Sequence, residues 1–270
     1  MKAARILGLM MVAMFSVMAC GGAELEADLG TLQGAIFNGS APNAPEHGAV
    51  VALMDVKLGY ASFFCSGTLI RPNVVLTAAH CLKGKKASKV VAFVGDQIQN
   101  LQVGVNTFYG SSLAVHPQYN SRTIVNDVAM LKLKQNVPGV TPVPEAPANI
   151  GLTIGERINF AGFGLTEDGT YGTKLQVDGT LQGFGCSAEL CGCQVPPGVP
   201  ASQICYHQTP PATGSGPCSG DSGGPAFVYR NGQAYVGAMT SYGDASCLVY
   251  GVSTRADAFE SFIHGFAGAN

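Results

Sequence analysis

Residues 217–225 read Pro217-Cys-Ser-Gly-Asp-Ser-Gly-Gly-Pro225, and they place one serine, Ser222, between an aspartate and two glycines. Glycine costs conformational entropy wherever a fold does not need its backbone freedom, so a cluster of glycines indicates a constrained turn. A serine hydroxyl is a weak nucleophile at neutral pH unless a neighbouring base accepts its proton. The stretch therefore predicts a reactive serine whose base lies elsewhere in the chain.

The rest of the chain has the composition of a loop-rich β protein. Charged residues make up 12% of its 270 residues and glycine 36 of them, against averages of roughly 25% and 7%. The net charge of −2 gives no reason to expect a nucleic acid partner. Short runs rich in apolar and β-branched residues, broken by Gly, Pro and Asn, predict strands. These expected strands are Ala49–Val56, Asn73–Thr77, Val90–Val94, Leu101–Val105, Asp127–Leu133, Arg157–Phe163, Lys174–Leu181, Ala226–Arg230 and Gln233–Thr240.

Only the end of the chain has a helical pattern. Phe259, Phe262, Ile263 and Phe266 recur at the spacing of one helix face. We expect an amphipathic helix that packs on the β structure.

Residues 1–20 have the pattern of an export signal, because Lys2 and Arg5 precede an apolar run too short to span a bilayer. The run ends in Val17-Met-Ala-Cys20, which resembles a bacterial lipobox and implies lipidation of Cys20 and membrane anchoring. The alternative is an ordinary signal peptide cut beside Cys20. Residues 21–35 are short and acidic, and we interpret them as a linker or propeptide. The expected location is the cell envelope or the extracellular space.

The chain has nine cysteines, and setting Cys20 aside leaves an even number. An even set in an exported protein predicts disulfides. The Cys191-Gly-Cys193 pair could suggest a metal, but no histidine or second cysteine pair has zinc-like spacing nearby, so we expect no metal and no cofactor. The remaining members of the set are Cys65, Cys81, Cys186, Cys205, Cys218 and Cys247.

Two further motifs supply the partners that the serine requires. Leu76-Thr-Ala-Ala-His80-Cys81 contains a histidine, the residue type whose ordinary pKa suits a base at neutral pH. Asn126-Asp127-Val-Ala-Met-Leu131 contains an aspartate, which can fix the tautomer of a catalytic histidine.

In the order His80, Asp127, Ser222, these motifs resemble the chymotrypsin/trypsin family of serine proteases. Further similar segments are Cys65–Ile70, Ala161–Gly164, Ser241–Gly243 and Gly251–Thr254. The resemblance implies an all-β fold of two six-stranded antiparallel β-barrels packed together with a C-terminal α-helix. Barrel one would cover about residues 36–140, barrel two about 141–255 and the helix about 256–266 of a protease domain at 36–270. It also implies a monomer that cleaves protein or peptide substrates.

Carried over position by position, the resemblance makes Ser222 the nucleophile, His80 the general acid and base, and Asp127 the carboxylate that orients it. The backbone N–H groups of Gly220 and Ser222 would bind the oxyanion. Ser241 would support Asp127, and Gly243 would hydrogen-bond an extended substrate.

Ile36-Phe-Asn-Gly39 resembles the start of the mature family enzymes. The resemblance implies a zymogen that is cut between Ala35 and Ile36, whose new amine pairs with Asp221.

The residues expected at the primary pocket are Gly216, Pro217, Ser241, Tyr242, Gly243 and Gly251. Gly216 stands where trypsins have aspartate, and Ser253 replaces a common pocket-floor tyrosine. A pocket without a carboxylate cannot compensate a buried Lys or Arg, so we expect apolar specificity, with the preferred size left open.

The resemblance also implies disulfides Cys65–Cys81, Cys218–Cys247 and Cys186–Cys205. The last would leave Cys191 to pair with Cys193, and other pairings of those four stay open. His47, His116, His207 and His264 have no motif partners and are expected in loops or on the surface. The rival function is a catalytically silent homologue that acts as a binding module.

Overall fold

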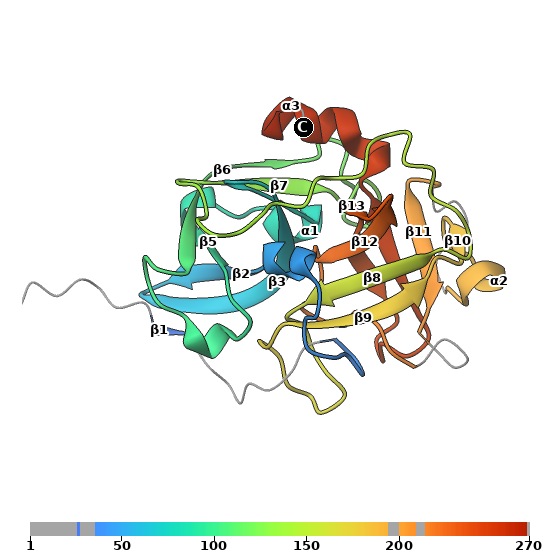
Figure 1. The fold of residues 1–270 in the computed structure, drawn as a ribbon, viewed down its shortest axis with the longest axis horizontal. Coiled ribbons are helices and arrows are strands. Elements are labelled where there is room, and N and C mark those ends of the chain that lie inside the picture. The colour runs from blue at the N-terminus through green and yellow to red at the C-terminus, as the bar shows by residue number, and fades with distance from the viewer. Residues whose placement is uncertain (1–25, 28–35, 194–199, 209–213, 269–270) are drawn as a thin grey trace, which may run out of the picture.

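The computed structural model describes residues 26–27, 36–193, 200–208 and 214–268. These residues form two packed β-sheets, with a helix at the C-terminal end of the chain (Figure 1). The all-β class and the double-barrel arrangement are therefore as expected. The signal, the proposed lipidation site Cys20, and Ala35 lie outside the described residues.

The first sheet closes into a barrel. Its order is β1-β3-β2-β5-β6-β7-β4, and a further pairing of β3 with β4 joins the two ends of the six-stranded part. The two-residue strand β1 (Glu26–Ala27) adds to the edge of β3 in parallel orientation. The other strands are β2 (Val50–Lys57), β3 (Tyr60–Arg71), β4 (Val74–Thr77), β5 (Val90–Phe93), β6 (Thr107–Val115) and β7 (Ala129–Leu133).

The second sheet has seven strands in the order β10-β11-β14-β13-β12-β8-β9. Within the described ranges no pairing joins β9 to β10, so this sheet is a curled half-barrel and not the closed six-stranded barrel that we expected. β10 (Gly183–Phe184) is only two residues long and offers little backbone for closure. The other strands are β8 (Arg157–Gly162), β9 (Leu175–Thr180), β11 (Gln203–His207), β12 (Pro225–Arg230), β13 (Gln233–Gly243) and β14 (Tyr250–Arg255).

Helical segments are short. None of the helices in the described part of the chain is long and apolar enough to cross a membrane. The α-helices are α1 (Ala79–Leu82), α2 (Ala188–Cys191) and α3 (Glu260–Ala267), and the 3-10 turns are η1 (Pro45–Ala49), η2 (Ala87–Lys89), η3 (Ile98–Asn100) and η4 (Asp257–Phe259).

Helix α3 docks on the first barrel through the apolar face that its sequence indicates. Ile263 is fully buried. The ring of His116 meets the edges of Phe259 and Phe262 at centroid distances of 5.1 and 4.8 Å. His264 Nε2 lies 2.9 Å from a carboxylate oxygen of Glu145. His116 and His264 thus have specific partners that sequence patterns did not indicate.

His47 is a correction to the expected surface histidine. Its side chain is buried, and Nε2 lies 2.8 Å from Asn159 Oδ1. Nδ1 accepts the backbone N–H groups of Asn43 and Ala44 at 3.2 and 3.3 Å. A buried histidine is stable when both ring nitrogens have partners.

The expected strand Leu101–Val105 is also wrong. This segment is a loop, and strand β6 begins two residues later at Thr107. The side chain of Asn106 accepts the N–H of Gln102 at 2.7 Å and donates to the carbonyl of Asn100 at 3.0 Å. Such local side-chain bonds compete with the strand ladder.

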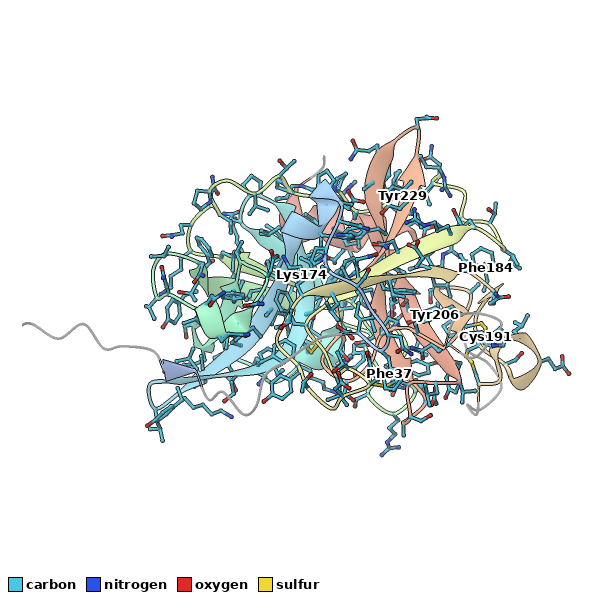
Figure 2. All side chains as sticks on the ribbon, turned by 60° about the horizontal axis from the view of Figure 1, so that its bottom comes forward. Phe37, Lys174, Phe184, Cys191, Tyr206 and Tyr229 are labelled. Carbon is cyan, nitrogen blue, oxygen red and sulfur yellow. A yellow bond between two sulfur atoms is a disulfide. The ribbon has the colours of Figure 1, made fainter. Side chains whose placement is uncertain are left out.

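Four disulfides join the eight cysteines. Cys65 pairs with Cys81 and Cys218 with Cys247, as the resemblance implied. The other four differ from the implied pairing, because Cys186 pairs with Cys193 and Cys191 with Cys205. The cause is that α2 sets Cys191 beside β11, whose Cys205 has its Cα 6.2 Å away (Figure 2).

Candidate active site

His80 and Asp127 meet because β4 pairs with β7. Residue Thr77 at the end of β4 is opposite Ala129 at the start of β7, so the segments that flank these strands lie together. His80 Nδ1 lies 2.8 Å from Asp127 Oδ2, and the backbone N–H of His80 donates to Oδ1 at 2.8 Å. A carboxylate can only accept here, so Nδ1 carries the proton and Nε2 is left with a free lone pair.

Ser241 provides a third donor to the same carboxylate. It lies at an irregularity of the β13–β14 ladder between Thr240 and Tyr242. Its hydroxyl donates to Asp127 Oδ2 at 2.5 Å. The Asp127 carboxylate is fully buried, and the hydrogen bonds from these three donors offset the free-energy cost of burying it.

Ser222 lies in the loop before β12, and its carbonyl accepts the N–H of Ser66 at 2.9 Å. Within the described part of the chain, no hydrogen bond joins the Ser222 hydroxyl to His80. Catalytic hydrogen bonds are often long without substrate and tighten when it binds.

Two glycines beside Ser222 are required by shape. Gly220 has φ +96°, and a Cβ there would lie 2.8 Å from the Phe63 ring. Gly223 has φ +78°, and a Cβ there would lie 1.9 Å from Thr77 Oγ1. The loop therefore packs its backbone directly against the first barrel, which any other residue would prevent.

The same loop leaves several N–H groups without an acceptor among the described residues, and two of them flank Asp221. The N–H groups of Asp221, Gly223 and Gly224 donate to backbone carbonyls at 2.7–3.0 Å. In contrast, the N–H groups of Gly220 and Ser222 have no acceptor among the described residues. Free N–H donors on either side of a candidate nucleophile can bind an oxyanion.

A pocket of about 180 Å³ opens beside Ser222. Four of the residues expected there line it: Pro217, Ser241, Tyr242 and Gly243. Gly216 does not, because the buried side chain of Gln208 covers it and would lie 2.1 Å from a Cβ at this position. Gly251 does not either, and Tyr206 covers it in the same way.

Tyr206 is the pocket residue that sequence reasoning missed. It comes from β11 (Figure 2). In the β11–β14 ladder it is paired with Gly251 of β14. Its hydroxyl lies 3.5 Å from Ser253 Oγ, and burial raises the pKa of its phenol. A tyrosine from the neighbouring strand thus lies beside the position where the family commonly has one. The sequence signal that could have pointed to Tyr206 was Ser253, which stands where the family commonly has a tyrosine.

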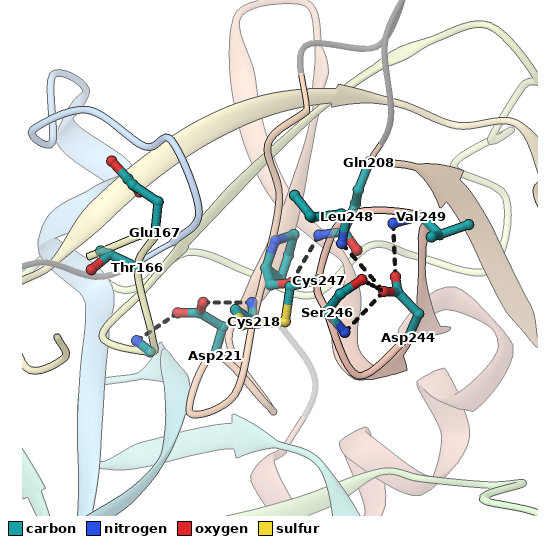
Figure 3. Close-up of a disulfide and its surroundings, with 12 residues drawn as sticks. Thr166, Glu167, Gln208, Cys218, Asp221, Asp244, Ser246, Cys247, Leu248 and Val249 are labelled. Carbon is teal, nitrogen blue, oxygen red and sulfur yellow. Dashed lines mark hydrogen bonds between the residues drawn. A yellow bond between two sulfur atoms is a disulfide. The ribbon is translucent and has the colours of Figure 1, made fainter. Parts of the chain in front are cut away.

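Asp244 also lines the pocket and was not anticipated. Its carboxylate turns to its own loop, where it accepts the N–H groups of Ser246 and Val249 at 3.0 and 2.8 Å (Figure 3). It also accepts the N–H of Tyr250 at 3.0 Å. Burial alone would raise the pKa of Asp244, but hydrogen bonds from the Ser246 side chain and from these backbone groups outweigh it and lower the pKa. The acid therefore holds the pocket wall in shape.

Asp221 is fully buried and has no cation as partner among the described residues. Its carboxylate accepts the N–H groups of Gly164 and Cys218 at 2.8 and 2.9 Å (Figure 3). Burial raises the pKa of Asp221 to about 7, although both hydrogen bonds act to lower it. The expected partner Ile36 is buried in the apolar core that packs with the second sheet, and Phe37 exchanges two backbone hydrogen bonds with Gly216 at 3.0 and 3.2 Å.

Comparison with known proteins shows the family of the chain. A sequence model of the family described as Trypsin matches residues 36–263. Brachyurin of Leptuca pugilator is 32% identical over 213 residues, covering 76% of this chain and 84% of that protein. A trypsin of Xenopus laevis is 31% identical, covering 80% and 85%. A chymotrypsin of Phaedon cochleariae is 32% identical, covering 70% and 66%. The chain belongs to the trypsin family of serine endopeptidases.

Proposed function

We propose that Ser222, His80 and Asp127 form the catalytic triad of this endopeptidase. The observation that carries the proposal is the hydrogen-bonded chain from Ser241 through Asp127 to His80, with two free N–H groups beside Ser222. His80 Nε2 accepts the Ser222 proton as the oxygen attacks the peptide carbonyl, and then gives it to the leaving amine. The N–H groups of Gly220 and Ser222 bind the oxyanion, and water hydrolyses the acyl-enzyme through the same base.

Labelling with a fluorophosphonate tests this role against the rival of a silent binding module. The processed chain should be labelled at Ser222, whereas the His80→Ala chain should react much more slowly because its serine has no base. Ser222→Ala is the control for labelling elsewhere. A folded, processed chain that is not labelled would favour the binding module.

We propose that the chain is made as a zymogen and is activated by a cut between Ala35 and Ile36. The support is Asp221, a buried carboxylate without a cation, whose charge the new amine of Ile36 would balance. N-terminal sequencing of the active form tests the proposal. An active form that begins well upstream of Ile36 would contradict it.

For specificity, we propose an apolar side chain in the pocket. No acid stands at Gly216, and the carboxylate of Asp244 is occupied by its loop. The relatives named above include a trypsin and a chymotrypsin, so their names do not decide the preference. A positional peptide library tests it, and preferred cleavage after Lys or Arg would contradict it.

We propose export, with lipid attachment at Cys20, from the pattern of residues 1–20 alone. The named relatives come from animals and lend no support to a bacterial origin. Detergent-phase partitioning of the full chain and of its Cys20→Ser variant tests lipidation. Equal partitioning of both into the aqueous phase would contradict it.

A further inference from the structure

A groove rich in lysine lies beside α1, outside the candidate active site. It has a volume of about 660 Å³. We call it the lysine groove, and its charged residues are Lys57, Lys83, Lys85, Lys86, Lys89 and Asp55.

The lysine groove concentrates positive charge in a chain whose net charge is −2. It holds five of the chain's 15 basic residues and one acid. Asp55 is already shared between Lys85 and Lys57, at 2.9 and 3.2 Å. Lys86 and Lys89 have no carboxylate partner within the described ranges, and both are exposed. A groove with this excess of positive charge fits an acidic peptide.

The first described residues of the chain reach the sheet at this place. Strand β1 pairs with β3 so that Glu26 is opposite Tyr60 and Ala27 opposite Ala61 (Figure 1). Tyr60 is in turn opposite Lys57 of β2. The positions of Glu26, Tyr60 and Lys57 therefore form one row across three strands, and Lys57 belongs to the lysine groove.

The sequence around β1 has the matching charge. Residues 24–28 read Glu-Leu-Glu-Ala-Asp, so acids alternate with apolar residues. In an extended strand alternate residues share one face, so the three carboxylates of this segment would lie together. Glu26, the middle acid of this segment, is in the same cross-strand row as Lys57.

We propose that the lysine groove is the docking surface for the acidic segment of residues 24–28. Backbone pairing of β1 with β3 fixes the register, and the carboxylates of Glu24, Glu26 and Asp28 meet the lysines. The segment belongs to the same chain, so its effective concentration at the groove exceeds that of an acidic region on another protein. These contacts lie upstream of the Ala35–Ile36 bond, so after a cut there, as proposed above, only the β1–β3 backbone pairing and the charge contacts hold the segment.

Amine labelling of the full chain tests this docking without relying on catalysis. The chain carries Ser222→Ala to prevent self-cleavage and is compared with the same chain carrying Glu24→Gln, Glu26→Gln and Asp28→Asn. A pulse of acetylating reagent at low salt, read by mass spectrometry, should modify Lys57, Lys86 and Lys89 about two- to fivefold faster in the neutralised chain, the effect of exposed ion pairs. At 1 M salt, where the Debye length is about 3 Å, the difference should vanish.

Lys132 and Lys134, exposed at and just after β7, are the internal controls and should react equally in both chains. A reciprocal measurement uses Lys57→Gln, Lys86→Gln and Lys89→Gln together, which should speed cutting after Glu24 and Glu26 by an added Glu-specific protease. Equal labelling of the three groove lysines in both chains at low salt overturns the proposal, and so does cutting that ignores the lysine changes. Either result would leave the groove to an acidic region of another protein, and neither bears on the catalytic triad.

Discussion

The ring of Tyr206 lies so close to Gly251 that a Cβ at residue 251 would be 2.3 Å from the ring carbon Cε2. The two residues face each other across β11 and β14. Glycine at 251 therefore does not open the pocket wall, because the tyrosine of the adjacent strand fills the space. The Tyr206 ring itself lines the pocket.

We predict that Tyr206→Ala shifts specificity toward large apolar residues. Removing the ring enlarges the pocket, so kcat/KM for phenylalanine relative to alanine before the cut bond should rise at least about tenfold, the scale on which apolar pockets discriminate size. The loss of a buried ring also costs about 3–5 kcal/mol of stability, so rates are normalised to the protein that a serine-directed label titrates. Tyr206→Phe keeps the ring and should leave the ratio unchanged. An unaltered ratio in Tyr206→Ala would show that this ring does not limit the pocket.

We predict unequal losses from the two residues behind His80. Asp127→Asn removes the acceptor that holds the His80 tautomer, a change that costs about 10⁴ in kcat in the family's template enzyme. Ser241→Ala removes one donor at 2.5 Å from Asp127 and should lower kcat about tenfold, the effect of one hydrogen bond to a charged group. Steady-state kinetics on a peptide ester measures both. An equal loss in the two variants would mean that Ser241 does more than support the carboxylate.

Sequence-based prediction worked best for features that a short motif or a local hydrophobic pattern determines. The segments around His80, Asp127 and Ser222 are short motifs of consecutive residues. They can therefore be recognised from the sequence alone. The terminal helix was visible for a similar reason, since its apolar residues repeat within two turns. Short continuous apolar runs such as Val90–Phe93 agree with the expected strand within one residue.

Prediction failed where residues distant in the sequence decide. Tyr206 reaches the pocket only because β11 pairs with β14, and the register that aligns it with Gly251 is not written in either strand alone. His47 can be buried because Asn159, more than a hundred residues later, accepts a hydrogen bond from its ring Nε2–H. Leu101–Val105 is a local exception, because the nearby Asn106 side chain hydrogen-bonds the backbone of Gln102 and Asn100 in place of a strand partner.

We predict that Glu145→Gln loosens α3 from the first barrel. Arg71 binds Glu145 through two hydrogen bonds at 2.8 and 2.9 Å, and His264 contacts the same carboxylate. Breaking this pair, in which the Glu145 carboxylate is buried and the Arg71 side chain is 14% exposed, should cost up to about 3–5 kcal/mol of unfolding free energy, measured by denaturant titration. Glu189→Gln in α2, which is exposed, should cost almost nothing.

The Glu145 site should also carry a signature at low pH. Burial would raise the pKa of Glu145, but the Arg71 hydrogen bonds and charge outweigh it and lower the pKa. A lowered folded-state pKa contributes stability that is present above the unfolded pKa of Glu and is lost as pH falls through the folded one. The difference between the native chain and Glu145→Gln should therefore shrink in acid. A difference that stays constant down to pH 2 would contradict this.

We predict that non-reducing peptide mapping finds Cys186 linked to Cys193 and Cys191 linked to Cys205. The link from α2 to β11 is expected because it joins two buried sulfurs already in contact. Recovery of a peptide in which Cys191 is linked to Cys193 would restore the pairing that the family resemblance implied.

We predict that the uncut chain loses stability as pH rises from about 4 to about 7, and that a cut before Ile36 removes this loss. In the uncut chain the pKa of Asp221 is raised from 3.8 to about 7 by burial. The folded state therefore favours the protonated acid, so the free energy of unfolding is highest below the unfolded pKa. It falls through this window by a few kcal/mol, at roughly 1.4 kcal/mol per pKa unit.

The test is the pH dependence of unfolding of the uncut Ser222→Ala chain, with and without Asp221→Asn. The asparagine variant has a lower stability overall, since it loses one acceptor for Gly164 or Cys218, but this pH dependence should be absent from it. In the cut chain the Ile36 amine stabilises the carboxylate, so the loss between pH 4 and 7 should disappear there as well. The same slope in all three chains would assign it to other groups and leave Asp221 without a role as the partner of a new amine.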